Sequence, residues 1–294
     1  MTTLPTRPGG ELGRELRAAY AFVERNANLI KRYWAWELVW LAYSIVSALS
    51  VTLIGKASTQ ITGAQMSSAQ VNTFILFLMV GTLVWHYLAM VFDLVSEAIQ
   101  WERWEGTIEY TFMAPISRLT HLLGQAAFAV IYGVLHTSVI MAIVAVFFQV
   151  DLSNANVPGM LLIVVTGSMS FIGLGMFAAV LPLLSPEKGL QMTNIIKTLV
   201  LLVSGVYYPV EVLPGWMQPL AYISPAYYML AGMRDALLKG APILPGLGAG
   251  SSGLLIPYIV PLLITGLITI PTGLWAFTRA ERYAKQTGKL KRNG

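Results

Sequence analysis

The sequence predicts an all-α membrane protein that forms one domain over residues 1–294, with six transmembrane helices. Hydrophobic residues make up 56% of the chain and charged residues only 11%, whereas soluble domains carry about 25% charged residues. Apolar runs of about twenty residues or more recur along the chain, and this is the length that crosses the hydrocarbon of a bilayer. The remaining segments are too short to hold a soluble domain.

The composition also excludes several kinds of site and partner. The chain has no cysteine, which removes disulfides and thiolate metal sites. Its net charge of +5 does not indicate a nucleic-acid partner, because the basic residues flank the apolar runs as the positive-inside rule expects. The first thirty residues are too polar and too charged for a cleavable signal peptide.

Residues 11–32 are predicted to form an amphipathic helix, with arginine and lysine on its polar side. This pattern is typical of a helix that lies in the membrane interface, with its apolar face in lipid and its cations toward the headgroups. A helix packed on other loops in solvent is the alternative. The apolar positions, which recur at steps of three and four residues, are Leu12, Leu16, Tyr20, Val23, Ala27 and Ile30.

Six apolar runs are predicted to span the membrane. Trp34, Trp36 and Trp40 open the first run, at the depth of the lipid headgroups where tryptophan is enriched. The six predicted spans are residues 34–54, 71–95, 122–148, 157–184, 193–208 and 254–277.

The basic residues orient these spans. With the N-terminus in the cytoplasm, the outer segments hold only Lys56, Arg234 and Lys239 of the 19 Lys and Arg in the chain. Cytoplasmic loops carry such an excess of positive charge in membrane proteins. We therefore expect a multi-pass protein of the plasma membrane with both termini in the cytoplasm.

The segment between spans two and three, WERWEGTIEYTFMAPISR, is the densest cluster of acidic groups in the chain. Glu102, Glu105 and Glu109 recur at i, i+3 and i+7, so one helix through them would carry all three on one face. Gly106 interrupts that helix and Pro115 should end it. A short helix with a carboxylate edge, held between two spans, predicts a docking surface for another protein.

The cytoplasmic region around this cluster, residues 98–118, has a second interpretation. The glutamates could solvate a loop, and Glu105 or Glu109 could pair with Arg103 or Arg118 within the chain. Pairing of this kind does not exclude docking, because a paired glutamate can still shape the surface.

Residues 209–253 are apolar but repeatedly broken by proline. The pieces between the prolines are too apolar for an exposed loop and too short to cross a bilayer. Non-helical backbone at membrane depth is tolerated only where protein or a water-filled cavity covers it. We expect a re-entrant pair of short helices that dips in from the outer side, and an interfacial loop lying flat is the alternative.

No pattern in the sequence predicts catalysis, a cofactor or a metal in this chain. The phosphate-binding pattern GxxxxGK[ST] is absent, so ATP is not expected to bind here in that way. His86, His121 and His136 lie far apart in the sequence without a zinc spacing, and no GxSxG nucleophile motif occurs. A membrane protein without these groups is most simply a conduit.

Two segments resemble a known family. EGTIEYTFMAPISR resembles the first signature of type 2 ABC export permeases, and within them it is most similar to permeases of the daunorubicin-resistance, multidrug kind. YYPVEVLPGWMQPLAYISPAYYMLAGMRDALL is similar to the second signature, through Pro214, Trp216, Pro225 and Arg234. The resemblance covers essentially the whole chain. The polysaccharide-exporting branch has a less similar first motif.

The resemblance implies a half-transporter of a bacterial or archaeal inner membrane. Two permease subunits, identical or sister chains, would pair, and each would contact a separate ATP-binding subunit that carries ATP and Mg. The helix between spans two and three would be the coupling helix that docks on that subunit. Trp101 and Trp104 depart from the signature and could anchor this helix at the headgroups. The matching coupling positions are Glu102, Glu105, Gly106, Glu109 and Arg118.

The resemblance also implies that spans two and five line the pathway and that transport runs outward. A drug-like or lipid-like amphipathic cargo would suit a wall rich in methionine and aromatic residues. A secondary transporter or a channel without an ATPase partner, or a polysaccharide-exporting ABC permease, is the alternative. The pathway candidates are Thr82, His86, Lys197, Thr198 and Ser204.

Overall fold

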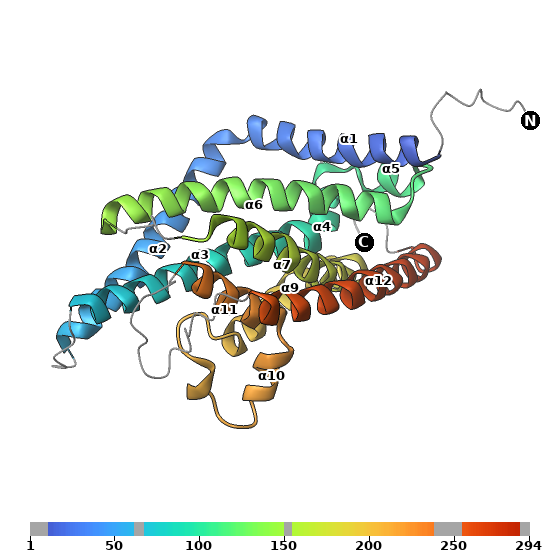
Figure 1. The fold of residues 1–294 in the computed structure, drawn as a ribbon. Helices are drawn as coiled ribbons and strands as arrows, with labels where there is room; N and C mark the ends of the chain where they lie inside the picture. Colours follow the sequence, from blue (N-terminus) through green and yellow to red (C-terminus); the bar gives the residue numbers. More distant parts are fainter. Residues whose placement is uncertain (1–10, 62–67, 150–154, 238–254, 289–294) are drawn as a thin grey trace, which may run out of the picture.

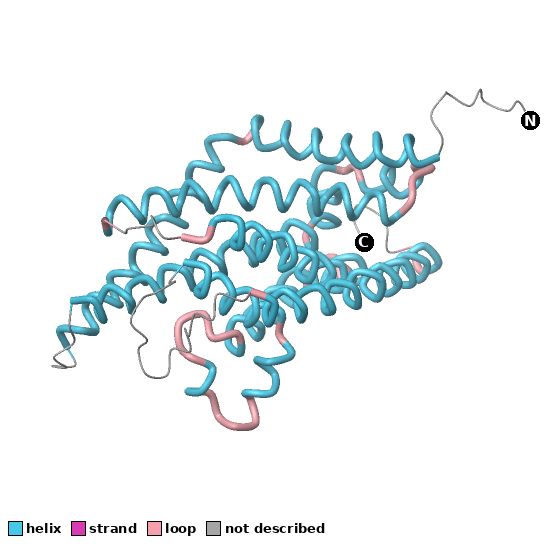
Figure 2. The backbone as a smooth tube through the Cα atoms, in the orientation of Figure 1, coloured by secondary structure: helices cyan, strands magenta, loops and turns pink. Residues whose placement is uncertain are grey.

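The computed structural model describes residues 11–61, 68–149, 155–237 and 255–288, and among them it contains helices and no strand. The helices form one bundle in which the long members run in similar directions (Figure 1), and Figure 2 shows the described loops between them in pink. The long helices are α1 (Glu11–Arg32), α2 (Trp34–Ile61), α3 (Ser68–Ser96), α6 (Arg118–Phe148), α7 (Val157–Ala178) and α12 (Ile256–Gln286). The short ones are α4 (Ala98–Glu105), α5 (Ile108–Met113), α8 (Val180–Leu184), α9 (Gly189–Val203), α10 (Gln218–Ile223) and α11 (Pro225–Leu237).

Five helical segments are long and apolar enough to cross a membrane. They coincide with predicted spans one, two, three, four and six, and the fourth consists of α7 continued by α8. A chain with this many spanning segments is a multi-pass membrane protein. The predicted all-α membrane fold is therefore confirmed.

The predicted bounds of span five, residues 193–208, are wrong. Helix α9 begins at Gly189 and ends at Val203, so its 15 residues cover about 22 Å of a hydrocarbon core that is about 30 Å thick. The helix stops there because Gly205 takes the left-handed conformation, with φ 70°, which glycine adopts without the steric cost that other residues meet. A sixth helix of full spanning length is not present in the described parts of the chain.

Helix α1 has the bounds that its amphipathic pattern predicted. It packs lengthwise on the first half of α6, and its beginning lies at the same end of the bundle as α5 and the end of α12 (Figure 1). Leu12, Leu16 and Tyr20 remain exposed on its surface. The structure thus contains the amphipathic helix, and its position in a membrane interface stays a prediction.

Helix α3 lies at the centre of the bundle, where it packs on α2, α6, α7 and α11. Leu88, Val91 and Val95 on α3 are fully buried. Helices α7 and α12 pack along each other through glycine: a Cβ added at Gly173 would lie 2.2 Å from the Thr269 hydroxyl oxygen. Small residues of this kind let helix backbones approach closely in membranes.

The region that follows α9 contains a pair of short helices, as predicted. Helix α11 packs against α3, α7 and α12, whereas α10 and the 3₁₀ turn Val210–Val212 stand away from the bundle in Figure 1. Residues 238–253 of the predicted outer region lie outside the described residues. The helical pair is thus present, and its depth in a membrane stays a prediction.

Candidate functional site

The segment between α3 and α6 forms two short helices with a sharp turn between them. Gly106 caps α4 in the left-handed conformation, with φ 73°, and its amide donates to the carbonyl of Arg103. This is the usual position of glycine just beyond a helix end. Because the chain changes direction at Gly106, Glu102, Glu105 and Glu109 do not share one helical face. The prediction that all three lie on one carboxylate edge is wrong.

Glu102 lies on the inner side of this segment and is only 1% exposed. Its Oε1 accepts from Arg25 Nη1 on α1 at 3.2 Å and from His121 Nε2 on α6 at 3.0 Å. Arg25 also donates from Nη2 to the hydroxyl of Thr107 at 2.9 Å. A buried carboxylate needs such partners because removing its charge from water is costly. Glu102 therefore joins α4 to α1 and α6.

Two arginines attach the same segment to the far side of the bundle. Arg103 donates from Nη2 to the Leu183 carbonyl on α8 at 2.9 Å. Arg118 pairs from Nε with Glu281 Oε1 on α12 at 2.9 Å. Arg118 also donates to the carbonyls of Thr111 and Phe112, at 3.1 and 2.7 Å. In this structure Arg118 is thus paired with α12 and not with Glu105 or Glu109.

The outer side of the segment is exposed, and we call it the coupling surface. Tyr110 and Met113 are 79% and 85% exposed, and the carboxylates of Glu105 and Glu109 are exposed beside them. The coupling surface consists of Trp104, Glu105, Glu109, Tyr110 and Met113. Of the predicted coupling positions, Glu105 and Glu109 therefore face outward, Gly106 forms the turn, and Glu102 and Arg118 hold the segment from inside.

The pathway candidates do not converge on one cavity. Thr82 is buried and bonds to the Leu78 carbonyl at 2.8 Å, within its own helix. Ser204 is buried as well, 3.0 Å from the Ser224 hydroxyl. Thr198 is exposed on α9 together with the apolar Ile195 and Leu199. Thr198 thus faces outward, whereas Thr82 and Ser204 are turned toward their own chain.

Lys197, also a pathway candidate, forms an ion pair between α9 and α3. Its Nζ lies 2.8 Å from Oδ1 and 2.6 Å from Oδ2 of Asp93. Glu97 follows one turn later, just beyond the end of α3. The pKa of Glu97 is raised to about 7, mainly by burial and also by the charge of Asp93, while the charge of Lys197 opposes the shift.

His86, the remaining candidate, is paired with a histidine that sequence reasoning treated as distant. His86 Nε2 lies 3.1 Å from His136 Nδ1, and the two rings stack with centroids 5.2 Å apart. Fifty residues separate them, and no spacing signal marks such a pair. No group of three or more His, Cys, Asp or Glu side chains that could hold a metal occurs among the residues that the structure describes.

Glu37 and Tyr132 form a second contact that the sequence did not indicate. The Tyr132 hydroxyl on α6 donates to Glu37 Oε2 in the first turn of α2. The Tyr132 ring also lies 5.5 Å from that of His136. These contacts extend a line of polar side chains from α2 through α6 to α3.

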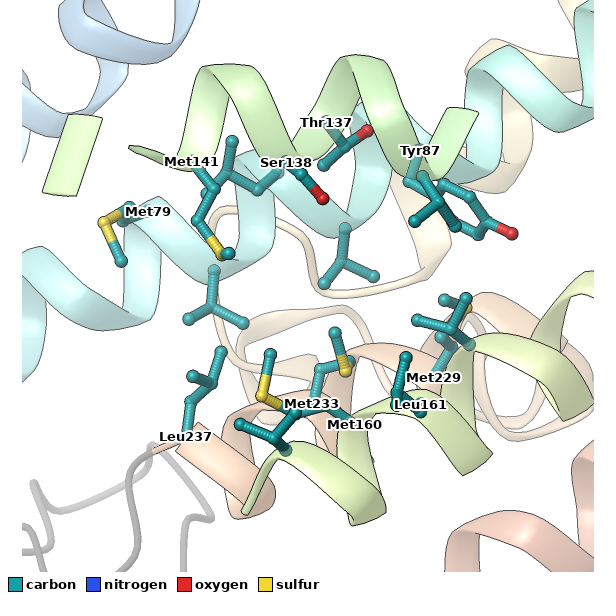
Figure 3. Close-up of a pocket in the computed structure, with 16 residues that line it drawn as sticks. Met79, Tyr87, Thr137, Ser138, Met141, Met160, Leu161, Met229, Met233 and Leu237 are labelled. Atoms are coloured by element: carbon teal, nitrogen blue, oxygen red, sulfur yellow. The ribbon is translucent and has the colours of Figure 1, made fainter. Parts of the chain in front are cut away.

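An apolar cavity of about 280 Å³ lies between α3, α6, α7 and α11. Figure 3 shows its methionine side chains pointing inward from helices on both sides. The hydroxyl of Thr137 is buried at its edge and has no partner among the described residues. The methionines that line it are Met79, Met141, Met160, Met229 and Met233.

The residues of the second signature divide into two groups. Arg234 is buried and donates to the carbonyls of Gly205 and Val206, at 3.0 and 2.7 Å, with its guanidinium 3.5 Å from the centroid of the Phe77 ring. Pro225 is buried and begins α11. Trp216 and Pro214 are exposed near α10. Arg234 and Pro225 thus fix the fold of this region, and Trp216 presents a free aromatic ring.

The spanning helices, the two-helix segment after α3 and the helical pair before α12 define the class of this protein: a multi-pass membrane permease subunit. The chain belongs to the ABC-2 type transporter family, whose sequence profile matches residues 19–238. In this family the chain is the transmembrane subunit of a transporter. The match begins within α1 and ends one residue after α11. It therefore includes both signature segments.

Curated relatives carry permease names. The "Inner membrane transport permease YadH" of Escherichia coli K12 is 22% identical over 217 residues, which cover 71% of this chain and 82% of that protein. The "Probable multidrug ABC transporter permease YbhR" of the same strain is 24% identical over 153 residues, 52% of this chain but only 41% of its own length. The "Linearmycin resistance permease protein LnrN" of Bacillus subtilis is 26% identical over 99 residues, 34% of this chain and 25% of LnrN.

Proposed function

We propose that this chain is one half of the membrane part of an ATP-driven exporter. It pairs with a second permease subunit, identical or a sister chain, and it is driven by a separate subunit that binds ATP and Mg. The cargo is a drug-like or lipid-like amphipathic compound, which leaves the cytoplasm through an inner membrane of a bacterium or archaeon. Membership of the family and the multidrug and resistance names of the relatives support this proposal.

The observation that carries the proposal is the two-sided build of the segment between α3 and α6. Its inner side is attached to α1, α6, α8 and α12 by Glu102, Arg103 and Arg118. Its outer side presents two carboxylates among aromatic and methionine side chains. Interface cores in proteins are enriched in aromatic residues and methionine. A surface of this kind, attached to four helices of the bundle, is suited to transmit the movement of a bound partner to them.

The mechanism follows from these attachments. When the ATP-binding subunits close, the coupling surface moves with them, and the four attached helices receive the displacement together. The two permease subunits then change between a state open to the cytoplasm and a state open to the outside. Nucleotide shifts the populations of these states by binding one of them better than the other.

The experiment replaces Glu105 and Glu109 by alanine in a complex of the permease with its ATP-binding subunit. We expect ATP hydrolysis to fall by at least about tenfold, or the complex to dissociate during purification, because the double variant loses both outward carboxylates. A tenfold change corresponds to about 1.4 kcal/mol. Glu24→Ala is the matched control, because Glu24 is exposed on α1 and not on the coupling surface.

Assembly and ATP hydrolysis at the wild-type level in the double variant would contradict the docking role. Transport by the purified permease alone, without nucleotide or partner, would contradict the whole proposal. That second result would favour a secondary transporter or a channel.

A further inference from the structure

A second cavity, of about 420 Å³, lies where α1, α2, α4 and α6 meet, and we call it the interfacial cavity. Its volume is in the range of small-molecule sites, which hold about 300–1,000 Å³. It differs from the methionine-lined cavity in Figure 3, which has no ionisable lining residue except Tyr87. The interfacial cavity has charged groups on one side and aromatic rings on the other.

The charged lining groups sum to one negative charge when the carboxylates are ionised. They are Glu37, Glu102 and Arg25. Arg25 is engaged with Glu102 and Thr107, at 3.2 and 2.9 Å. Glu37 stands in the first turn of α2, where the helix dipole favours a negative charge. The lining therefore attracts a cation and repels an anion.

One of these carboxylates has an oxygen without a partner. Glu102 is 1% exposed, and its Oε2 makes no hydrogen bond with the described residues. Leaving a buried charged oxygen unpaired carries the full cost of its lost hydration. The side chain of Glu102 lines the cavity, so a small turn of its carboxylate would present this oxygen to a ligand that donates hydrogen bonds, such as an ammonium group.

The walls suit the apolar part of such a ligand. Trp36 and Trp101 are 58% and 44% exposed, so their rings are accessible beside the cavity. Inside, the rings of Phe128 and Tyr132 stack with centroids 5.6 Å apart. Aromatic faces attract cations within about 6 Å, and tryptophan is enriched at the depth of lipid headgroups.

We propose that the interfacial cavity binds an amphipathic cation, with its ammonium group on Glu37 and Glu102 and its hydrocarbon against the aromatic walls. Two sources share this chemistry: a free long-chain amine and the amine headgroup of a phospholipid. The inference deepens the proposed function by naming a charge class for the cargo or lipid, and it rests on that function only for the route of transport. Because Glu102 belongs to α4, the bound cation also contacts the element that carries the coupling surface.

The test measures binding to the full-length permease in lipid nanodiscs made of phosphatidylglycerol, without nucleotide or partner. The probe is dodecylammonium, titrated calorimetrically below its micellar concentration, and dodecanoate is the anionic match. We expect saturable binding of dodecylammonium to the wild type and none of dodecanoate. Glu37→Gln should weaken binding at least about tenfold, because it removes a charge and keeps an acceptor for Tyr132.

Two further variants test whether the effect of Glu37→Gln is specific to the cavity. Glu24→Gln removes an exposed carboxylate from α1 away from the cavity and should bind like the wild type. Trp36→Ala should weaken binding without a change in charge, and its thermal unfolding shows whether the protein remains folded. Equal binding by the wild type, Glu37→Gln and Trp36→Ala would overturn the proposal, as would equal binding of dodecanoate.

The source of the natural ligand is decided by competition. Phosphatidylethanolamine added to the nanodiscs should displace the probe if a lipid headgroup occupies the cavity. Retention of the probe would assign the site to a free amphipathic amine. Since binding is measured without ATP hydrolysis, a failure here is distinct from a failure of the coupling proposal.

Discussion

The segment between α3 and α6 carries the coupling surface, and we call it the coupling segment. This segment and the region of α10 and α11 are both made of short helices, yet they are held in different ways. In the coupling segment, Glu102 and Arg118 form ion pairs with charged side chains of α1 and α12. In the second region, the buried Arg234 forms no ion pair with the described residues and donates to the backbone carbonyls of Gly205 and Val206. Pairs of charges thus contribute to holding the first region, whereas in the second region a single buried charge is held by backbone carbonyls.

The difference agrees with the surfaces that the two regions present. The coupling surface carries exposed carboxylates, whereas the exposed residues around α10 include the apolar Val212, Trp216 and Ile223. A guanidinium held on carbonyls is suited to surroundings that offer no other acceptor. The comparison predicts unequal losses when each arginine is removed.

The largest loss is expected for Arg234→Met. The substitution leaves the carbonyls of Gly205 and Val206 buried without a donor, so it should lower the free energy of unfolding by about 3 kcal/mol. Unfolding of the purified protein in detergent measures this loss. The control is Arg279→Met, which removes an exposed arginine. Equal stability of the two variants would remove the distinction between the regions.

A smaller effect is expected for the pair of Arg118 and Glu281. A double-mutant cycle with alanine at each position should give a coupling energy of about 1.5 kcal/mol, because the pair is mostly buried. The same cycle on Arg14 and Glu15, a pair at 3.9 Å whose arginine is exposed, should give a value near zero. A coupling energy for the first pair that matches the second would mean that α12 is not held through Arg118.

The smallest effect is expected at Glu97, which lies between α3 and α4. Its pKa is about 7 against an ordinary 4.5, so the folded protein keeps a proton that the unfolded chain releases in this range. The resulting stability is complete below pH 4.5 and is lost as the pH rises through 7. Between pH 5 and 8 the wild type should lose on the order of 1 kcal/mol relative to Glu97→Gln, after allowance for screening.

Unfolding midpoints of both proteins at several pH values test this expectation. Glu24→Gln serves as the control and should follow the wild type. Parallel pH profiles for the wild type and Glu97→Gln would show that Glu97 releases its proton at an ordinary pH.

Hydropathy and length were sufficient to predict the five full spans, because a spanning helix needs an apolar surface along its whole length. Helix periodicity failed at Glu102 because it assumed one straight helix, although the sequence itself placed Gly106 where the chain turns. The end of α9 was missed because Gly205 lies in an apolar run that does not interrupt hydropathy. The contacts of His86 with His136 and of Glu37 with Tyr132 join distant segments, and no local pattern encodes them.

The glycine contact between α7 and α12 has a mechanical consequence. The backbone at Gly173 lies so close to α12 that an added Cβ would overlap Thr269. We therefore expect these two closely packed helices to move together in a rearrangement of the subunit. The distance between spin labels on α7 and α12 should therefore stay constant. It provides a reference against which displacements of α9 and α10 are measured.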